Sequence, residues 1–167
     1  LDFSSLPQES IELKVPPTGF PVLQFHFGDN TDYYRHKHFT NQSLFIGQCS
    51  RHIMLYPIRG MKLLGVNFKP YGLYNLFGIS PYGFMNSGME SRFFFGEKNV
   101  NRISQILKIG GIEKGIAEIE SLLLTYQDKY VKLQPYFDGL VDKMETENGL
   151  INQQDILDKN VSVRTLQ

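Results

Sequence analysis

The hydrophobic period of the sequence changes at Pro70, and this change limits the folds that the chain can adopt. From Ile11 to about Phe68, apolar and polar residues alternate with period two and turns come often. This pattern is typical of a compact antiparallel barrel or sandwich. Beyond Gly96 the apolar residues recur at helical spacing. Strands followed by helices predict an α+β fold, with its sheet formed by the first part of the chain.

We expect about six strands in the first part, bounded by Gly, Pro and Asn turns. They are Ile11–Val15, Leu23–Phe27, Tyr33–Phe39, Ser43–Gly47, Arg51–Ile58 and Lys62–Phe68. Pro70 to Ser80 predicts a short helix, with proline in its first turn and Gly78 at its end. Phe93 to Phe95 are expected to form a last strand.

Two apolar stripes at helical spacing predict a helical hairpin after the strands. The first contains Val100, Ile103, Ile106 and Leu107, and the second contains Ile112, Ile116, Ile119, Leu123, Tyr126 and Tyr130. Gly110 separates the two. A third helix is expected to start near Pro135 and to end before Gly149.

The longer helix of the hairpin has more apolar surface than one stripe requires. Ala117, Leu124 and Val131 are seven residues apart and mark a second face. One interpretation is a contact between two copies of the chain in a homodimer. The alternative is a helix that is buried on two sides within the monomer.

Composition restricts the partners and the compartment of the chain. Its 167 residues predict one principal domain and a fragment of another. Seventeen basic and seventeen acidic residues leave no net charge, so no overall field attracts the chain to nucleic acid or to an anionic membrane. Cys49 is the only cysteine, which excludes an internal disulfide and favours the cytoplasm. No apolar run approaches the roughly 20 residues of a membrane helix, so we expect no membrane contact.

Three segments of the chain carry a family resemblance. They are PTGFPVLQFHFGD (17–29), GMKLLGVNFKPYGLYNLFGIS (60–80) with Asn86, and above all VSVRTLQ (161–167). Together they resemble segments of AraC-type transcription regulators. The resemblance implies a small antiparallel cupin-like β-barrel sensor in residues 1–98. A helical hairpin in residues 99–131 would follow, and then an incomplete helix-turn-helix DNA-binding domain in residues 132–167.

The same resemblance implies how DNA would be contacted. Pro135–Asn148 would be the leading helix, Asn152 to about Lys159 the second, and Ser162 onward the recognition helix, whose first residues face base edges in the major groove. Ser162, Arg164 and Gln167 are the candidate DNA contacts, through base edges or phosphate. DNA binding would require the complete carboxy-terminal domain.

The first part of the chain also has the composition of a small-molecule pocket. Many aromatic residues stand beside a few polar ones, a mixture that such pockets use. The candidate ligand contacts are His26, Arg35, His36 and Tyr56. These residues would equally suit a core with a polar rim. The effector would be an unknown small molecule.

His36 and His38 are the strongest candidates for a catalytic metal site, with His52 and His26 as further candidate ligands. Period two places both imidazoles on one face of a strand, as a shared metal needs. No carboxylate follows at the spacing that cupin metal sites use. We therefore expect no metal, no cofactor and no enzymatic activity, and we predict a DNA-binding transcription regulator. The alternative is a cupin-like metal-dependent enzyme that uses these two histidines.

Overall fold

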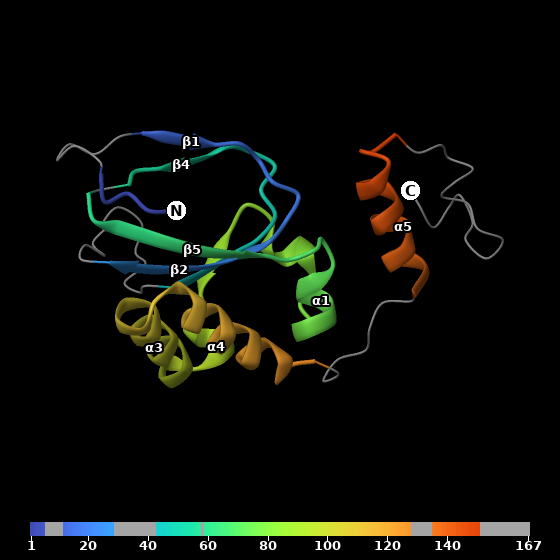
Figure 1. Cartoon of the computed structure of the whole chain (residues 1–167). Coiled ribbons are helices and arrows are strands. Elements are labelled where there is room, and N and C mark those ends of the chain that lie inside the picture. The colour runs from blue at the N-terminus through green and yellow to red at the C-terminus, as the bar shows by residue number, and fades with distance from the viewer. Residues whose placement is uncertain (6–11, 29–42, 58, 128–134, 151–167) are drawn as a thin grey trace. The chain divides into compact units, whose positions relative to one another are not determined.

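The chain divides into two compact units, Leu1–Val131 and Lys132–Gln167, in a computed structural model. Figure 1 shows the helices and strands of both units and labels most of them. The second unit is represented by its first helix and the turn that follows it. The structure describes residues 1–5, 12–28, 43–57, 59–127 and 135–150.

Six strands form two antiparallel sheets in the described part of the first unit. The larger sheet has the order β5-β2-β3-β6 and the smaller sheet pairs β1 with β4. The bounds are Leu13–Val15 for β1, Val22–Gly28 for β2, Ser43–Ile46 for β3, Ile53–Leu55 for β4, Met61–Asn67 for β5 and Gly88–Glu90 for β6.

Five of the six expected strands before Pro70 are confirmed, although β4 is much shorter than expected. The sixth, Tyr33–Phe39, lies outside the described residues. The α+β class is likewise confirmed. The described residues form two separate sheets rather than a closed barrel, so the cupin-like barrel stays a prediction.

The predicted helix after Pro70 is confirmed as α1 (Gly72–Phe77). Gly78 ends it in the left-handed conformation, with φ of 67°, and donates its N–H to the carbonyl oxygen of Tyr74 at 2.8 Å. A side chain is strained at such a φ, which is why glycine commonly ends helices. A 3-10 turn, η2 (Pro81–Phe84), leads from there toward β6.

The predicted strand at Phe93 to Phe95 is wrong, because this segment is helix α2 (Arg92–Phe95). The amides of Phe94 and Phe95 both donate to the carbonyl oxygen of Ser91 at 3.0 Å. In a strand, neighbouring side chains point to opposite faces. The helical turn instead lets Phe94 and Phe95 both pack on Phe45, while Phe93 is exposed.

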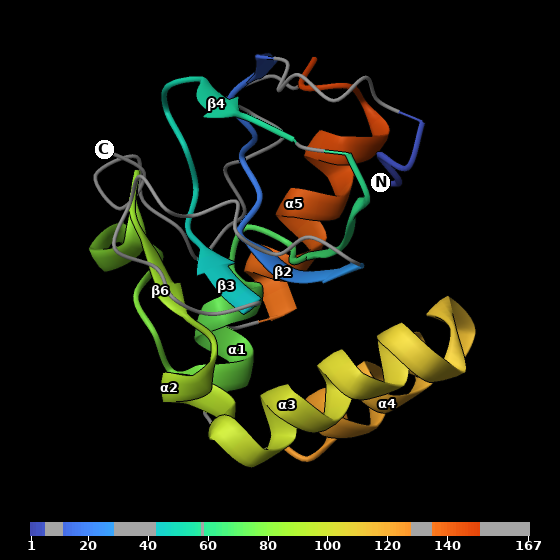
Figure 2. The ribbon, with the colours of Figure 1, turned by 90° about the vertical axis from the view of Figure 1, so that its left-hand side faces the viewer.

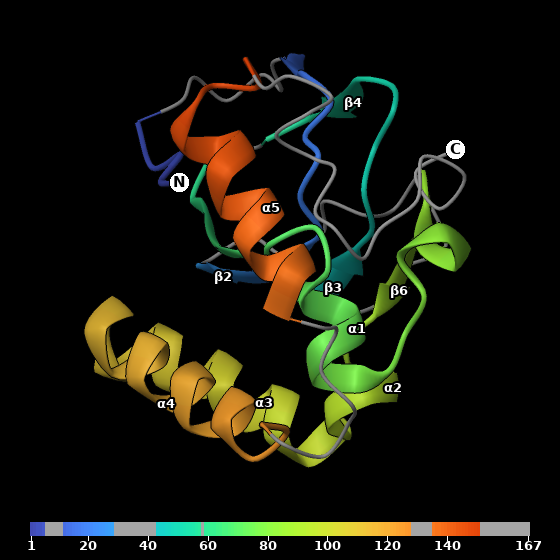
Figure 3. The same ribbon diagram turned by 90° about the vertical axis from the view of Figure 1, so that its right-hand side faces the viewer.

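A helical hairpin covers one face of the larger sheet, as Figures 1 and 2 show. It consists of α3 (Glu97–Gln105), a π-helical turn η3 (Ile106–Gly110) and α4 (Ile112–Leu124). Figure 3 shows α3 and α4 side by side. The guanidinium of Arg102 joins them by donating to both carboxylate oxygens of Glu118 at 3.0 Å. The predicted hairpin is therefore confirmed.

The second predicted stripe is only partly correct. Ile119 is buried, and Leu123 and Tyr126 pack against the core, but Ile112 and Ile116 are exposed. Helix α4 ends at Leu124, and Tyr130 lies outside the described residues. The buried face of α4 is rotated relative to the predicted stripe, because Gly115, which has no side chain, lies where α4 meets Leu107.

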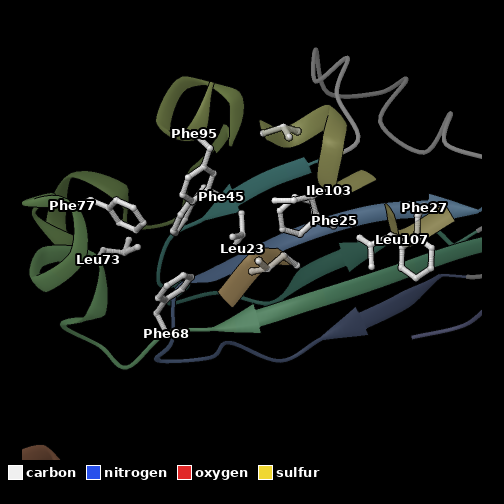
Figure 4. Close-up of a cluster of buried hydrophobic side chains, with 12 residues drawn as sticks. Leu23, Phe25, Phe27, Phe45, Phe68, Leu73, Phe77, Phe95, Ile103 and Leu107 are labelled. Carbon is white, nitrogen blue, oxygen red and sulfur yellow. The ribbon is translucent and has the colours of Figure 1, made fainter. Parts of the chain in front are cut away.

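The main core lies between the larger sheet and the hairpin, where Figure 4 shows its side chains. Leu23, Phe25 and Phe27 of β2 enter it from the sheet. The other members are Phe45, Phe68, Leu73, Phe77, Phe95, Val100, Ile103, Leu107 and Ile119. Aromatic rings pack closely here, such as Phe45 and Phe68 with centroids 5.3 Å apart. The period-two pattern of β2 thus assigns its odd-numbered residues to the helix side.

The second unit begins with α5 (Pro135–Thr146), which confirms the third predicted helix. Asn148 and Gly149 follow with φ of 51° and 78°. The amide of Gly149 donates to the carbonyl oxygen of Met144 at 2.8 Å, so the helix ends in a left-handed cap. No helix among the described residues is long and apolar enough to cross a membrane.

Candidate functional site

The even-numbered residues of β2 form the opposite face of the larger sheet, toward the small β1–β4 sheet (Figures 1 and 2). Gln24 and His26 lie on this face. Leu44 pairs with both Gln24 and Glu90, and paired residues project from the same face, so Glu90 belongs to it too. We call these three polar residues, Gln24, His26 and Glu90, the inter-sheet layer.

His26 is the most strongly perturbed titratable group of this layer. Its side chain is buried, with 2% of the residue exposed. Burial disfavours the charged imidazolium and lowers the pKa of His26 to about 4. The imidazole is therefore neutral at physiological pH, with one nitrogen that donates and one that accepts a hydrogen bond.

Glu90 and Gln24 complete the polar face. The buried carboxylate of Glu90 lies 2.7 Å from Nε of Arg92, so its charge is balanced locally. The buried Oε1 of Gln24 accepts no hydrogen bond from the described residues. Small-molecule pockets commonly use polar groups of this kind, an imidazole, an amide and a carboxylate, among apolar side chains.

Sequence comparison identifies the family of this unit. Residues 3–90, just over half of the chain, match the family described as Domain of unknown function (DUF6597). The chain belongs to this family. No curated protein and no solved structure matches the chain. The DUF6597 domain covers β1 to β6 and contains the entire inter-sheet layer, whereas α3 and α4 lie beyond it.

The structure places two of the four predicted ligand contacts of the DUF6597 domain. His26 is buried in the inter-sheet layer, while Tyr56, just after β4, is 41% exposed. Their surroundings therefore differ. Arg35 and His36 lie outside the described residues.

Sequence reasoning missed two residues of the layer. The sequence pattern could have identified Gln24, because it lies two residues before His26 and so on the same face of the strand. Glu90 was not, because the last strand was expected at Phe93 to Phe95 and lies instead at Gly88–Glu90. Only the pairing of β6 with β3 brings Glu90 to this face.

No group of three or more His, Cys, Asp or Glu side chains in the described part of the chain could hold a metal ion. His36 and His38, the predicted metal pair, lie outside the described residues. Burial raises the pKa of the Cys49 thiol, so burial disfavours the thiolate that nucleophilic chemistry needs.

The predicted dimer and DNA contacts are placed only in part. Ala117 and Leu124 are both exposed on α4, with Leu124 64% exposed. Val131 lies outside the described residues, as do Ser162, Arg164 and Gln167.

Proposed function

We propose that this chain is the sensing and dimerising part of a DNA-binding transcription regulator, and that it is not an enzyme. DUF6597 domains are known in AraC-type regulators, and VSVRTLQ at residues 161–167 resembles the start of that family's first recognition helix. A small-molecule effector would bind the first unit, the hairpin would join two copies, and the completed second unit would contact DNA.

The observation that carries the proposed sensor role is the two-sided character of β2. One face carries Gln24 and His26 in the inter-sheet layer. The other face packs on the hairpin, with Leu23, Phe25 and Phe27 in one cluster with Ile103, Leu107 and Ile119. Only the strand β2 would thus lie between the proposed ligand and the hairpin.

This arrangement provides a route for coupling. Cores are close-packed, so a small shift of β2 changes how Phe25 and Phe27 fit against α3 and η3. A ligand shifts the population only if it binds the two packing arrangements with different affinity. The hairpin would report that difference to the dimer.

The proposed DNA contacts follow α5. A helix-turn-helix places the amino-terminal residues of its recognition helix at base edges while the preceding helix contacts the DNA backbone. Arg164 can donate two hydrogen bonds to guanine, Gln167 can pair with adenine, and the hydroxyl of Ser162 suits a cap or a phosphate.

A selection from random duplex DNA tests the DNA-binding part. The protein encoded by the complete gene is expected to enrich one motif. Arg164→Ala should weaken binding to that motif by about 1–3 kcal/mol, which is roughly 5- to 150-fold. Lys108→Ala, an exposed cation in η3 of the other unit, is the matched control and should leave binding unchanged. Absence of an enriched motif would contradict the proposal.

A ligand screen tests the sensor part independently. A bound effector should raise the melting temperature of the chain, because it binds the folded state. Gln24→Leu should abolish this shift if the amide contacts the ligand, since it removes the polar group while filling similar space. A shift that persists unchanged in both Gln24→Leu and His26→Leu would place the ligand elsewhere.

A further inference from the structure

A basic hollow lies at the end of the small sheet, outside the inter-sheet layer. Its volume is about 570 Å³. The residues that line it are Lys14, Pro16, Pro17, Ser50, Arg51 and His52. Three of them carry basic side chains and none carries a carboxylate, although the chain as a whole has no net charge. The basic character of this hollow is therefore local.

Two consecutive prolines create the hollow. The β1–β4 ladder ends at the pair Val15 and Ile53, beyond which Pro16 and Pro17 have no N–H with which to continue it. The two segments meet again where Cys49 donates its amide to the carbonyl oxygen of Thr18 at 3.4 Å. Pro16, Pro17, Ser50, Arg51 and His52 lie between these two points and line the hollow, and Lys14 lines it from within the ladder.

The loop that supplies Ser50, Arg51 and His52 is held by Asn86. The side-chain Oδ1 of Asn86 accepts the backbone amide hydrogen of Ser50 at 2.9 Å, and the backbone N–H of Asn86 donates to the carbonyl oxygen of Gln48 at 2.8 Å. A further bond runs from the amide of Gly47 to the carbonyl oxygen of Ser87 at 3.0 Å. The position of the loop is thus fixed before any ligand arrives, which reduces the entropy lost on binding.

We propose that this basic hollow binds the oxyanion group, phosphate or carboxylate, of a small molecule. The planar guanidinium of Arg51 presents paired donors that match two oxygens of such a group. Lys14 supplies a second, compact positive charge from the opposite strand. The imidazole of His52 supplies a shorter-range donor, whereas the hydroxyl of Ser50 already donates to Oδ1 of Asn86 at 3.2 Å. The site is separate from the sensor proposed above, and neither depends on the other.

Titration with inorganic phosphate tests the proposal, with the imidazole proton signals of His52 as the local reporter. In about 0.1 M NaCl, where surface charges further than roughly 10 Å apart are screened, we expect saturable binding of one phosphate per chain. The double variant Lys14→Gln and Arg51→Gln should weaken this binding at least about tenfold. The matched control is the double variant Lys108→Gln and Lys114→Gln, which removes two exposed positive charges of the hairpin. It should bind phosphate as the parent does.

Asn86→Gly tests whether the loop is pre-positioned. Glycine keeps the positive φ of 57° at this position but removes the side chain that holds Ser50. Binding should weaken although no ligand contact is removed, while circular dichroism shows an unchanged fold. Phosphate affinity equal to that of the parent would show that the loop needs no such support, which would overturn this part of the proposal.

Parallel titrations identify the source of the oxyanion. Saturation by phosphate but not acetate assigns a phosphate-bearing ligand, and the reverse assigns a carboxylate. If neither anion saturates the signals, or if the double variant binds as the parent does, the proposal is wrong. If only a DNA duplex binds, and the double variant loses that binding, the hollow is a DNA contact and the small-molecule assignment is also wrong.

Discussion

Helices α4 and α5 have similar lengths, 13 and 12 residues, and each contains an interior glycine, but the two glycines lie in different surroundings. In α4, a Cβ on Gly115 would lie 2.1 Å from Cδ2 and 2.7 Å from Cγ of the buried Leu107. In α5, a Cβ on Gly139 would meet no described atom within 4 Å. Close packing against η3 requires a glycine at this position of α4, whereas no described atom restricts the glycine of α5.

The largest expected difference between these helices concerns their apolar residues. Ile119→Ala in α4 should lower the free energy of unfolding by about 2–5 kcal/mol, because Ile119 is 2% exposed within the core. Leu140→Ala in α5 should lower it by only about 1 kcal/mol, since Leu140 is half-buried. Urea unfolding followed by circular dichroism measures both. Equal losses would remove the distinction between the two helices.

Acid should destabilise the first unit through His26, while α5 contains no histidine. The pKa of His26 falls from 6.5 to about 4 on burial, so between these values the unfolded chain binds a proton that the folded chain excludes. Stability is fully present above pH 6.5 and declines as the pH falls toward 4, by up to roughly 3 kcal/mol.

Melting curves at pH 7 and pH 5 measure this dependence. The parent should lose more stability between these two pH values than His26→Gln does, because glutamine does not titrate. The remaining histidines and the carboxylates are common to both proteins, so they cancel in the comparison. An identical pH dependence in the two proteins would contradict a neutral, buried His26.

Replacing each of the two glycines by alanine should change stability by a smaller amount, and the two changes should have opposite signs. Gly115→Ala should destabilise by about 1–2 kcal/mol, because crowding against Leu107 exceeds the gain in helix propensity. Gly139→Ala should stabilise by roughly 0.5–1 kcal/mol, because the propensity gain is unopposed. Thermal unfolding distinguishes them. A stabilising Gly115→Ala would show that α4 and Leu107 are not packed as described.

The smallest effect on stability is expected at the proposed dimer face. Leu124→Glu should change the free energy of unfolding of the monomer by less than about 0.5 kcal/mol, since Leu124 is 64% exposed. It should instead weaken self-association, as measured by sedimentation. Ile116→Glu, on a different side of α4 and 40% exposed, is the matched comparison. If Leu124→Glu associates as strongly as the parent, the face of Ala117 and Leu124 is not the dimer contact.

The sequence predicted those parts of the fold that follow a regular period or a specific backbone requirement. The alternation in β2 assigned Phe25 to one face and His26 to the other, and Gly78 correctly ended α1. Three consecutive phenylalanines, 93 to 95, have no period, so their helical conformation depended on the tertiary position of Phe45.

Pairings between distant segments explain what the sequence could not predict. Glu90 entered the inter-sheet layer only through the partner strand β3, and no local pattern encodes that pairing. The first strand was predicted to end at Val15, before Pro16 and Pro17, and β1 ends there. That Arg51 and His52 line the hollow beside these prolines depends on the β1–β4 register, which the local sequence does not reveal.

The most direct test of the regulator proposal is to map the protein on chromosomal DNA in cells that express its complete gene, by crosslinking and immunoprecipitation. The proposal predicts a small number of discrete sites that share one motif and that are lost in Arg164→Ala but kept in Lys108→Ala. Recovery of no site above an untagged control, from a protein that is folded and abundant in those cells, would contradict it.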